Sequence, residues 1–313
     1  MKKQKYKTIQ TNNSNKEKDC MKKTKIRAYG KINLYFELVN KRKDGFHNIK
    51  SIIQNIDLYD EIILEETKKG INIESNLQDI PRDEKNTVYK AVEIIKDKYK
   101  VEKGLDIFLR KKIPHQAGLG GGSSDAAAVI EALNKIWKLN MGKDEKHLIA
   151  SQIGTDVHFF LEGGSSYIKG KGDITKKIKD FNWNYIILIK PEINISTPYI
   201  YSKVKIKDLS KDDGDKILDI YREKSKTELI SYLKNDLENI VFREFKEIKD
   251  IKKTMMENKA LIALMSGSGS SVFGFFDNKK DMDACKKIMK NNYKYVITTK
   301  TIEKGYDYER QTK

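Results

Sequence analysis

The sequence has little cysteine and little proline: two cysteines, Cys20 and Cys285, and four prolines in 313 residues. The cysteines have dissimilar neighbours and no Cys-x-x-Cys spacing, so a disulfide scaffold and a zinc site are both poorly supported. This favours a reducing, cytoplasmic setting. The longest apolar runs, such as Ala260–Met265, are far too short to cross a bilayer. We therefore expect no membrane-spanning helix and no membrane partner.

Lysine and arginine (62 residues) outnumber aspartate and glutamate (45 residues), which leaves a formal charge of +17. One interpretation is an anionic partner, such as nucleic acid, a membrane surface or a phosphorylated ligand. The other is a drift in composition toward lysine, with the charge spread over a solvated surface. The basic residues are mostly lysines mixed with acidic ones, and no arginine-rich tract suited to bidentate phosphate contacts is present. We favour the dispersed surface.

Residues 1–24 are polar and lysine-rich with no apolar period. They lack the apolar core of a secretory signal, so we predict a disordered basic tail. Met21 opens a stretch that looks like a natural protein start, and our hypothesis is that it is an alternative start. The remaining length suits two domains, which we predict at residues 25–181 and 182–313.

Strand and helix patterns occur in blocks rather than in a regular alternation, which favours an α+β fold. We expect a strand, a turn at Leu58–Glu61 and a second strand within Ser51–Leu64, and one helical stretch over Leu237–Glu257. The other predicted helices are Asn86–Lys100, Asp125–Trp137, Lys143–Ile153, Lys211–Lys224, Thr227–Leu233 and Asp281–Asn291. The other predicted strands are Ile26–Val39, Ile71–Ile73, Leu105–Arg110, Ser165–Ile168, Ile174–Ile178, Tyr185–Ile189, Ala260–Ser266, Ser271–Phe276 and Tyr295–Thr299.

Four glycines and two serines fill Gly118–Ser124, directly before an alanine-rich, helix-forming run. Glycine allows positive φ, so several backbone N–H groups can approach one anion. The start of the following helix adds unpaired N–H donors and a partial positive charge. No Gly-Lys-Ser/Thr follows, so this is not a Walker A loop. The residues alone leave open a flexible loop before a capped helix, but they favour a phosphate cradle.

The stretch from Pro114 to Ala128 resembles the second motif of the GHMP kinases, and its triple glycine resembles the branch that acts on 4-diphosphocytidyl-2-C-methyl-D-erythritol. The resemblance implies a two-domain GHMP kinase fold. Its N-terminal domain is related to the ribosomal protein S5 domain 2-like fold, and its C-terminal domain is a ferredoxin-like α/β sandwich. It also implies ATP and Mg²⁺ as cofactors. The residues implied for ATP are Pro114, Gly118, Leu119, Gly120, Gly121, Gly122, Ser123 and Ser124.

Two further segments resemble the motifs that carry the catalytic residues of that kinase. Ala28–Leu34 matches its N-terminal motif with Tyr29-Gly30 in place of Pro-Ala, and places Lys31 and Asn33 on one face of a strand. Ile153–Phe160 matches the motif whose aspartate is the catalytic base, here Asp156, although His158 stands where proline is common. Without the resemblance, a solvated edge strand and a turn carboxylate are the alternatives.

The element Arg42–His47 separates this branch from other GHMP kinases. In the family its aromatic residue stacks on cytosine and its histidine hydrogen-bonds the base, which here implies Phe46 and His47. Thr197 and Tyr201 lie in a segment that resembles the second aromatic wall of that site. Asn235–Glu238 and Met265–Phe273 resemble later motifs, the last of which forms a second glycine loop. Without the family, His47 is an exposed loop histidine.

The resemblance implies transfer of the ATP γ-phosphoryl group to the 2-hydroxyl of 4-diphosphocytidyl-2-C-methyl-D-erythritol, in the non-mevalonate route to isoprenoids. Asp156 would accept the hydroxyl proton, and Lys31 would stabilise developing charge. No metal-ligating residue is identified. We expect a small-molecule substrate, no nucleic-acid partner, and a monomer or weak homodimer. The alternatives are a homoserine- or mevalonate-type GHMP kinase and a basic nucleic-acid-binding protein.

Overall fold

The structure is a computed structural model and describes residues 23–210 and 216–308. The predicted tail lies outside these residues except at its last two positions, and so does the proposed start at Met21. Thr24 already belongs to the first strand.

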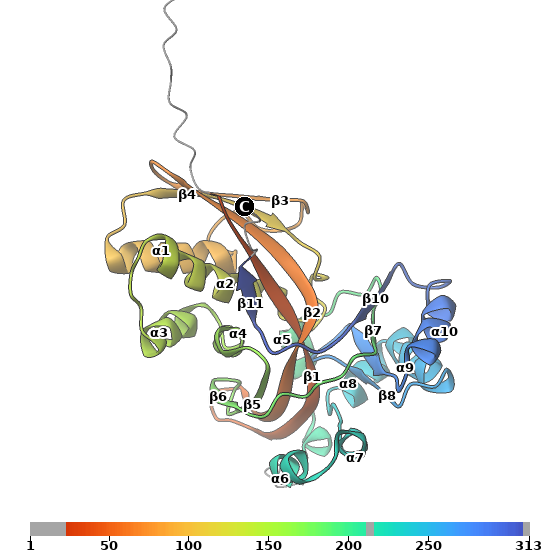
Figure 1. Cartoon of the computed structure of the whole chain (residues 1–313). Helices are drawn as coiled ribbons and strands as arrows, with labels where there is room; N and C mark the ends of the chain where they lie inside the picture. Colours follow the sequence, from red (N-terminus) through yellow and green to blue (C-terminus); the bar gives the residue numbers. More distant parts are fainter. Residues whose placement is uncertain (1–22, 211–215, 309–313) are drawn as a thin grey trace, which may run out of the picture.

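A sheet of seven strands forms the first part of the molecule, with β1 (Thr24–Lys41) and β2 (His47–Thr67) as a long central hairpin (Figure 1). The predicted turn at Leu58–Glu61 is wrong, because β2 runs through these residues and pairs with β1 on both sides of a register shift at residues 56–58. On its other edge, β2 pairs with different strands along its length. Ser51–Gln54 pair with β5 (Ser165–Lys169), whereas Glu61–Thr67 pair with β4 (Gly104–Arg110). β3 (Ile71–Ser75) and β6 (Ile174–Lys177) complete the outer positions.

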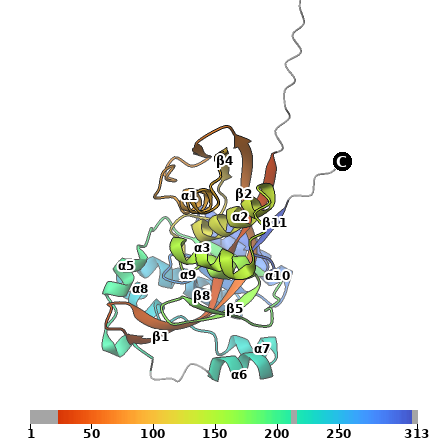
Figure 2. The same cartoon turned by 90° about the vertical axis from the view of Figure 1, so that its left-hand side faces the viewer.

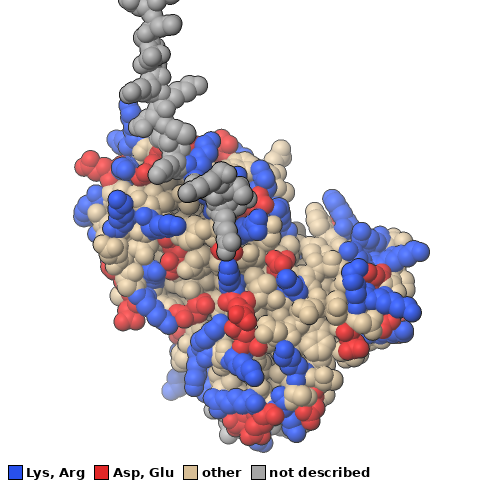
Figure 3. All heavy atoms as spheres, in the orientation of Figure 1, with Lys and Arg blue, Asp and Glu red and all other residues tan. Residues whose placement is uncertain are grey.

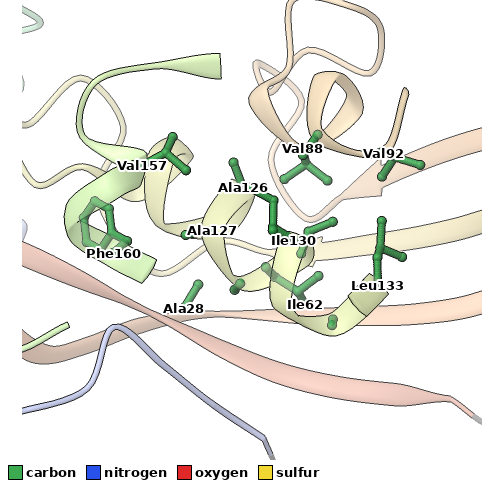
Figure 4. Close-up of a cluster of buried hydrophobic side chains, with 14 of the residues drawn as sticks. Ala28, Ile62, Val88, Val92, Ala126, Ala127, Ile130, Leu133, Val157 and Phe160 are labelled. Carbon is green, nitrogen blue, oxygen red and sulfur yellow. The ribbon is translucent and has the colours of Figure 1, made fainter. Parts of the chain in front are cut away.

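Four helices cover one face of this sheet: α1 (Thr87–Tyr99), α2 (Gly121–Ile136), α3 (Lys143–Ile153) and α4 (Val157–Glu162) (Figure 2). The helix α2 lies at the centre of the group, because its alanines let it approach both the sheet and its neighbours. Figure 4 shows Ala126, Ala127 and Ile130 of α2 between residues of the sheet and of α1 and α4. The glycine loop that precedes α2 is thereby fixed to the core of this part.

A second, antiparallel sheet has the order β10-β7-β9-β8. Its strands are β7 (Ile186–Lys190), β8 (Ile262–Met265), β9 (Val272–Phe275) and β10 (Tyr295–Thr299). Its central strand β7 is buried on both faces: Ile187 and Ile189 join a core with α9 (Lys246–Glu257) and α10 (Lys279–Met289), whereas Ile186 and Leu188 join residues of β1 and β2. A run of consecutive apolar residues is typical of such a strand.

The remaining helices lie in the sequence between β7 and β8 of the second sheet: α5 (Thr197–Ser202), the 3₁₀ turn η1 (Ile206–Asp208), α6 (Lys216–Glu223), α7 (Lys226–Ile230) and α8 (Glu238–Glu244). The single helical stretch predicted over Leu237–Glu257 is wrong, since the chain leaves helical geometry at Phe245 between α8 and α9. The prediction for residues 211–215 lies outside the described residues. After β10 the chain returns to the first sheet, where β11 (Tyr306–Tyr308) pairs with β1.

The α+β prediction is confirmed, with two sheets of different topology and helices packed on each. The boundary predicted near Asn182 stays a prediction. No helix in the described ranges is long and apolar enough to cross a membrane. On the face drawn in Figure 3, lysine and arginine side chains are interspersed with acidic ones over both parts.

Candidate active site

One large cavity, of about 880 Å³, collects residues from both parts of the molecule. It receives side chains from β1, the start of β2, the loop before α2, the residues before α4, and α5. The sequence had predicted site residues that lie far apart in the chain, and the structure brings all but one of them to this cavity. They are Lys31, Asn33, Phe46, His47, Pro114, Gly118, Leu119, Gly120, Gly121, Gly122, Ser123, Asp156, Thr197 and Tyr201.

The glycine loop needs glycine at two positions. Gly118 has φ +74, and a Cβ there would lie 2.0 Å from the carbonyl oxygen of Ser266. Gly120 has φ +70, and a Cβ there would lie 2.6 Å from the ring of Phe160. The helix α2 begins at Gly121, four residues before the predicted start at Asp125. Gly121, Gly122 and Ser123 therefore form its first turn, whose N–H groups have no partner within the helix and can bind an anion.

Ser124 is the exception among the predicted residues. Its side chain is fully buried and does not line the cavity. Its hydroxyl donates a 2.7 Å hydrogen bond to the carbonyl oxygen of Tyr29. Its backbone N–H donates to Gly120 at 2.9 Å. Ser124 thus fixes the helix start to β1, and of the two serines only Ser123 faces the cavity.

A second glycine loop packs against the first, and its Gly267 and Ser268 also line the cavity. The hydroxyl of Ser266 donates to the carbonyl oxygen of Gly118 at 2.8 Å, and the N–H of Ser271 donates to Ala117 at 3.3 Å. The side-chain amide of Asn235 donates to the carbonyl oxygens of Met265 and Gly267 at 2.7 and 2.8 Å. Asn235 therefore holds the second glycine loop in place, and that loop in turn supports the first.

Lys31 and Asn33 lie on the same face of β1, as the strand period predicts. The Nζ atom of Lys31 donates a 2.6 Å hydrogen bond to Oδ1 of Asn33, whose amide donates to the hydroxyl of Ser51 at 2.9 Å. Burial lowers the pKa of Lys31 below its ordinary value, while the carboxylate of Asp156 acts in the opposite direction. Ser51, which orients Asn33 from the neighbouring strand β2, belongs to none of the sequence motifs above.

Asp156 immediately precedes α4, a helix that the sequence analysis did not predict. Phe160 of this helix packs against Gly120, so α4 connects Asp156 with the glycine loop. His158 causes no disruption of the helix. Its ring lies against His147 of α3, with the ring centroids 5.1 Å apart and the planes 6° from parallel.

Aromatic side chains line part of the cavity. His47 is 6% exposed, so it is not an exposed loop histidine, and its ring centroid lies 5.4 Å from that of Tyr201. Burial, and to a lesser degree Lys41, lower the pKa of His47, while burial and Asp156 raise the pKa of Tyr201. The side chain of Phe46 is 59% exposed at the mouth of the cavity.

Three cavity contacts were missed by the sequence analysis. The Nζ atom of Lys171 lies 5.6 Å from the ring centroid of Phe46, and the hydroxyls of Thr197 and Ser268 are 2.7 Å apart. Lys111 is buried beside the glycine loop and forms ion pairs with Asp60 and Asp125. The two carboxylates raise the pKa of Lys111 although burial opposes them. Lysines are frequent in this chain, so nothing in the sequence indicated that Lys111 and Lys171 lie at the cavity.

The described residues offer few side chains that could bind a metal ion. Among the residues that the structure describes, no group of three His, Cys, Asp or Glu side chains is arranged to hold a metal. Mg²⁺ is commonly bound through one or two carboxylates together with nucleotide phosphates. The cavity, with Asp156 and the hydroxyl of Ser123 on its wall, therefore fits a metal that arrives with a nucleotide better than a dedicated metal cage.

Comparison with known families gives two matches. The family model of the GHMP kinases N-terminal domain matches residues 86–164, and that of the GHMP kinases C-terminal domain matches residues 218–294. The first match contains the glycine loop and Asp156.

Two curated relatives are similar over most of their length, and both are named 4-diphosphocytidyl-2-C-methyl-D-erythritol kinase. The protein from Thermoanaerobacter pseudethanolicus is 40% identical over 289 residues, which cover 92% of this chain and 99% of the relative. That from Clostridium botulinum (strain Kyoto / Type A2) is 38% identical over 277 residues, covering 88% and 99%.

Solved structures of kinases are also similar to this chain. A crystal structure of 4-(cytidine 5'-diphospho)-2C-methyl-D-erythritol kinase matches with a TM-score of 0.76 and 26% identity, covering 88% of this chain and 98% of the other. A homoserine kinase from Cytophaga hutchinsonii matches with a TM-score of 0.70 and 20% identity over 98% and 100% of the two chains, a likeness of fold alone.

Proposed function

The chain belongs to the GHMP kinases, in the family of 4-diphosphocytidyl-2-C-methyl-D-erythritol kinases, and on this premise we propose that it transfers the γ-phosphoryl group of ATP to the 2-hydroxyl of 4-diphosphocytidyl-2-C-methyl-D-erythritol. One observation carries the proposal. A phosphate-type glycine loop, the pair Lys31 and Asp156, and the rings of His47 and Tyr201 all line one cavity. The three features correspond to the phosphate donor, the reacting group and the pyrimidine of the acceptor.

Asp156 is proposed as the general base. In phosphoryl transfer the protein mainly positions the reactants and stabilises charge. Asp156 accepts the proton of the attacking hydroxyl, while the ammonium group of Lys31 stabilises the charge that develops on the transferred group. The hydrogen bond from Lys31 to Asn33 and its support by Ser51 hold the ammonium group in place.

The loop Gly118–Ser123 and the first turn of α2 bind the ATP phosphates, with the N–H groups as donors and the hydroxyl of Ser123 as a further contact. Mg²⁺, when bound with the nucleotide, supplies charge neutralisation at the phosphates. The residues that would hold it are Ser123 and Asp156, which line the cavity.

His47 and Tyr201 are proposed to hold the cytosine. A ring face and a directional donor or acceptor can recognise a pyrimidine, and His47 offers both from a buried position. Phe46 and Thr197 line the same cavity. Binding energy from the cytosine serves to orient the reacting hydroxyl.

The test is an ATP-consumption assay with the cytidylyl substrate, compared with mevalonate and homoserine under the same conditions. Turnover of the cytidylyl substrate with little turnover of the other two is expected. Faster turnover of homoserine or mevalonate would refute the acceptor assignment. Salt-sensitive nucleic-acid binding without ATP turnover would instead favour a nucleic-acid-binding protein.

A further inference from the structure

Three buried ionisable side chains lie at the base of the glycine loop: Asp60 of β2, Lys111 directly after β4, and Asp125 of α2. The Nζ atom of Lys111 donates to Oδ2 of Asp60 and to Oδ2 of Asp125. Lys111 and Asp125 are 14 positions apart in the sequence, and the glycine loop lies between them. A buried ionic network adds little net stability, because burial of its charges is costly, but it can fix a geometry.

The second carboxyl oxygen of Asp60 holds the chain where it enters the loop. Oδ1 of Asp60 accepts from the backbone N–H groups of Lys112 and Ile113, from the latter at 2.8 Å. The backbone of Lys111 is fixed by Asn76, which directly follows β3. The N–H group of Lys111 donates to Oδ1 of Asn76 at 2.7 Å, and Nδ2 of Asn76 donates to the carbonyl oxygen of Lys111 at 3.2 Å. The entry side of the loop is therefore tied to two strands of the first sheet.

The two ends of the loop pack in different hydrophobic cores. Ile113 and Leu119 belong to a core that also contains Leu264 of the second sheet. Ala126 and Ala127, directly after Asp125, belong to the core that α2 shares with α1 and α4 (Figure 4). Apolar packing alone therefore does not fix one end relative to the other, whereas the side chain of Lys111 joins them directly.

We propose that Asp60, Lys111 and Asp125 form an ionic clamp at the base of the glycine loop, and that they are positioning residues for ATP. This rests on the binding of ATP phosphates by the loop, as proposed above. The clamp holds the loop and the first turn of α2 in their binding arrangement before the nucleotide arrives. A preformed loop need not be ordered during binding, so the clamp tightens the binding of ATP.

Lys111 also lines the cavity, so a direct contact between its ammonium group and a phosphate is the competing explanation. The two explanations differ in the effect of removing Asp125. If Lys111 contacted the phosphate, loss of Asp125 would free one of its N–H donors, and ATP would bind more tightly. If Lys111 acts through the clamp, loss of Asp125 releases the start of α2, and ATP binds more weakly.

The experiment compares Lys111→Met, Asp125→Leu and Asp125→Asn with the wild type, by calorimetric binding of a non-hydrolysable ATP analogue with Mg²⁺. Methionine keeps the apolar stem of Lys111 without its donors, and leucine has about the size of Asp125 without an acceptor. Both substitutions should raise the Kd of the analogue by about tenfold or more, the effect of losing a hydrogen bond to a charged group. Asparagine keeps an oxygen that accepts from Lys111, so Asp125→Asn should restore most of the affinity that Asp125→Leu loses.

Lys146→Met is the matched control. The Nζ atom of Lys146 on α3 pairs with Glu131 of α2 at 2.8 Å, in the same helix as Asp125 but away from the cavity. This substitution should lower the free energy of unfolding in urea titrations and leave the Kd of the analogue unchanged.

A split between the two substrates separates positioning from a merely structural role. In Lys111→Met and Asp125→Leu the KM for ATP should rise, while the KM for the cytidylyl substrate stays close to the wild-type value. Equal rises in both KM values, or tighter binding of the analogue by Asp125→Leu, would overturn the clamp.

Hydrogen exchange of the wild type tests the clamp even if Lys111→Met does not fold. Without nucleotide, the N–H groups of Lys112 and Ile113, which donate to Asp60, should exchange as slowly as those inside α2. In Asp125→Leu the same two groups should exchange faster. Fast exchange in the nucleotide-free wild type, with protection only after the analogue is added, would contradict a preformed loop.

The clamp and the proposed function can fail separately. If the wild type binds the ATP analogue more tightly than Asp125→Leu but does not phosphorylate the cytidylyl substrate, the acceptor assignment fails and the clamp stands. If the wild type phosphorylates that substrate and both Lys111→Met and Asp125→Leu bind the analogue equally well, the clamp alone fails.

Discussion

The hydroxyl of Ser266 donates a 2.8 Å hydrogen bond to the carbonyl oxygen of Gly118. This bond joins the second glycine loop to the first, across 148 positions of the sequence. Ser266→Ala should lower the free energy of unfolding by about 1 kcal/mol, the usual net value of such a bond. It should also raise the KM for ATP, because the loop that binds phosphate loses its support.

Ser271 provides a matched control for this substitution. Its hydroxyl is buried and has no hydrogen-bond partner within the described part of the chain. Ser271→Ala should therefore leave both the unfolding free energy and the KM for ATP close to the wild-type values. Equal effects of the two substitutions in urea titrations and ATP kinetics would contradict the assigned bond.

Gly120→Ala tests the shape of the glycine loop. The added Cβ would meet the ring of Phe160 at 2.6 Å with φ at +70, so the loop must shift. A loss of 1.4 kcal/mol in phosphate binding corresponds to a rise of about tenfold in the KM for ATP. Gly142 at the start of α3 is the control, because its added Cβ would meet nothing within 4 Å. A KM equal to that of Gly142→Ala would refute the close fit.

Asp156→Asn should lower kcat by roughly 100-fold or more, the range for loss of a general base. Substrate binding should change little, since asparagine keeps the shape of the side chain. Steady-state kinetics and calorimetric binding of the cytidylyl substrate measure the two effects separately. Turnover close to the wild type would remove Asp156 from this role.

His47→Ala should raise the KM for the cytidylyl substrate by about tenfold, the effect of losing one well-placed hydrogen bond of about 1.4 kcal/mol. The KM for ATP serves as the internal control, because His47 belongs to β2 and not to the glycine loop. An equal rise in both values would argue against recognition of cytosine by His47.

Lys31 predicts an alkaline limit of activity. Burial lowers its pKa below the ordinary 10.5, so the ammonium group loses its proton at a lower pH than an exposed lysine does. Activity that needs the cation should therefore decline before pH 10.5. In Lys31→Arg the guanidinium stays charged, so any residual activity should persist to higher pH. An unchanged alkaline limb in Lys31→Arg would show that another group causes it.

The sequence motifs predicted which residues line the cavity more accurately than the apolar periodicity predicted the bounds of the helices and strands. The positions of Lys31 and Asn33 followed from the strand period, whereas α2 begins at Gly121, four residues before its predicted start. The continuity of β2 could not be predicted, because it depends on strand partners that lie about a hundred residues away in β5. The helix α4 is six residues long, too short for a helical period to show, and so the neighbours of His158 remained hidden.

The return of β11 to β1 has a consequence for biosynthesis. Ile26, Arg27 and Ala28 pair with Tyr308, Asp307 and Tyr306, which the ribosome makes after every other described strand. Until then, this stretch of β1 has an open edge that other chains can pair with. The sheet that carries Lys31 is therefore complete only after the second sheet has been synthesised, so a translational arrest within α10 would leave a nascent chain prone to aggregation.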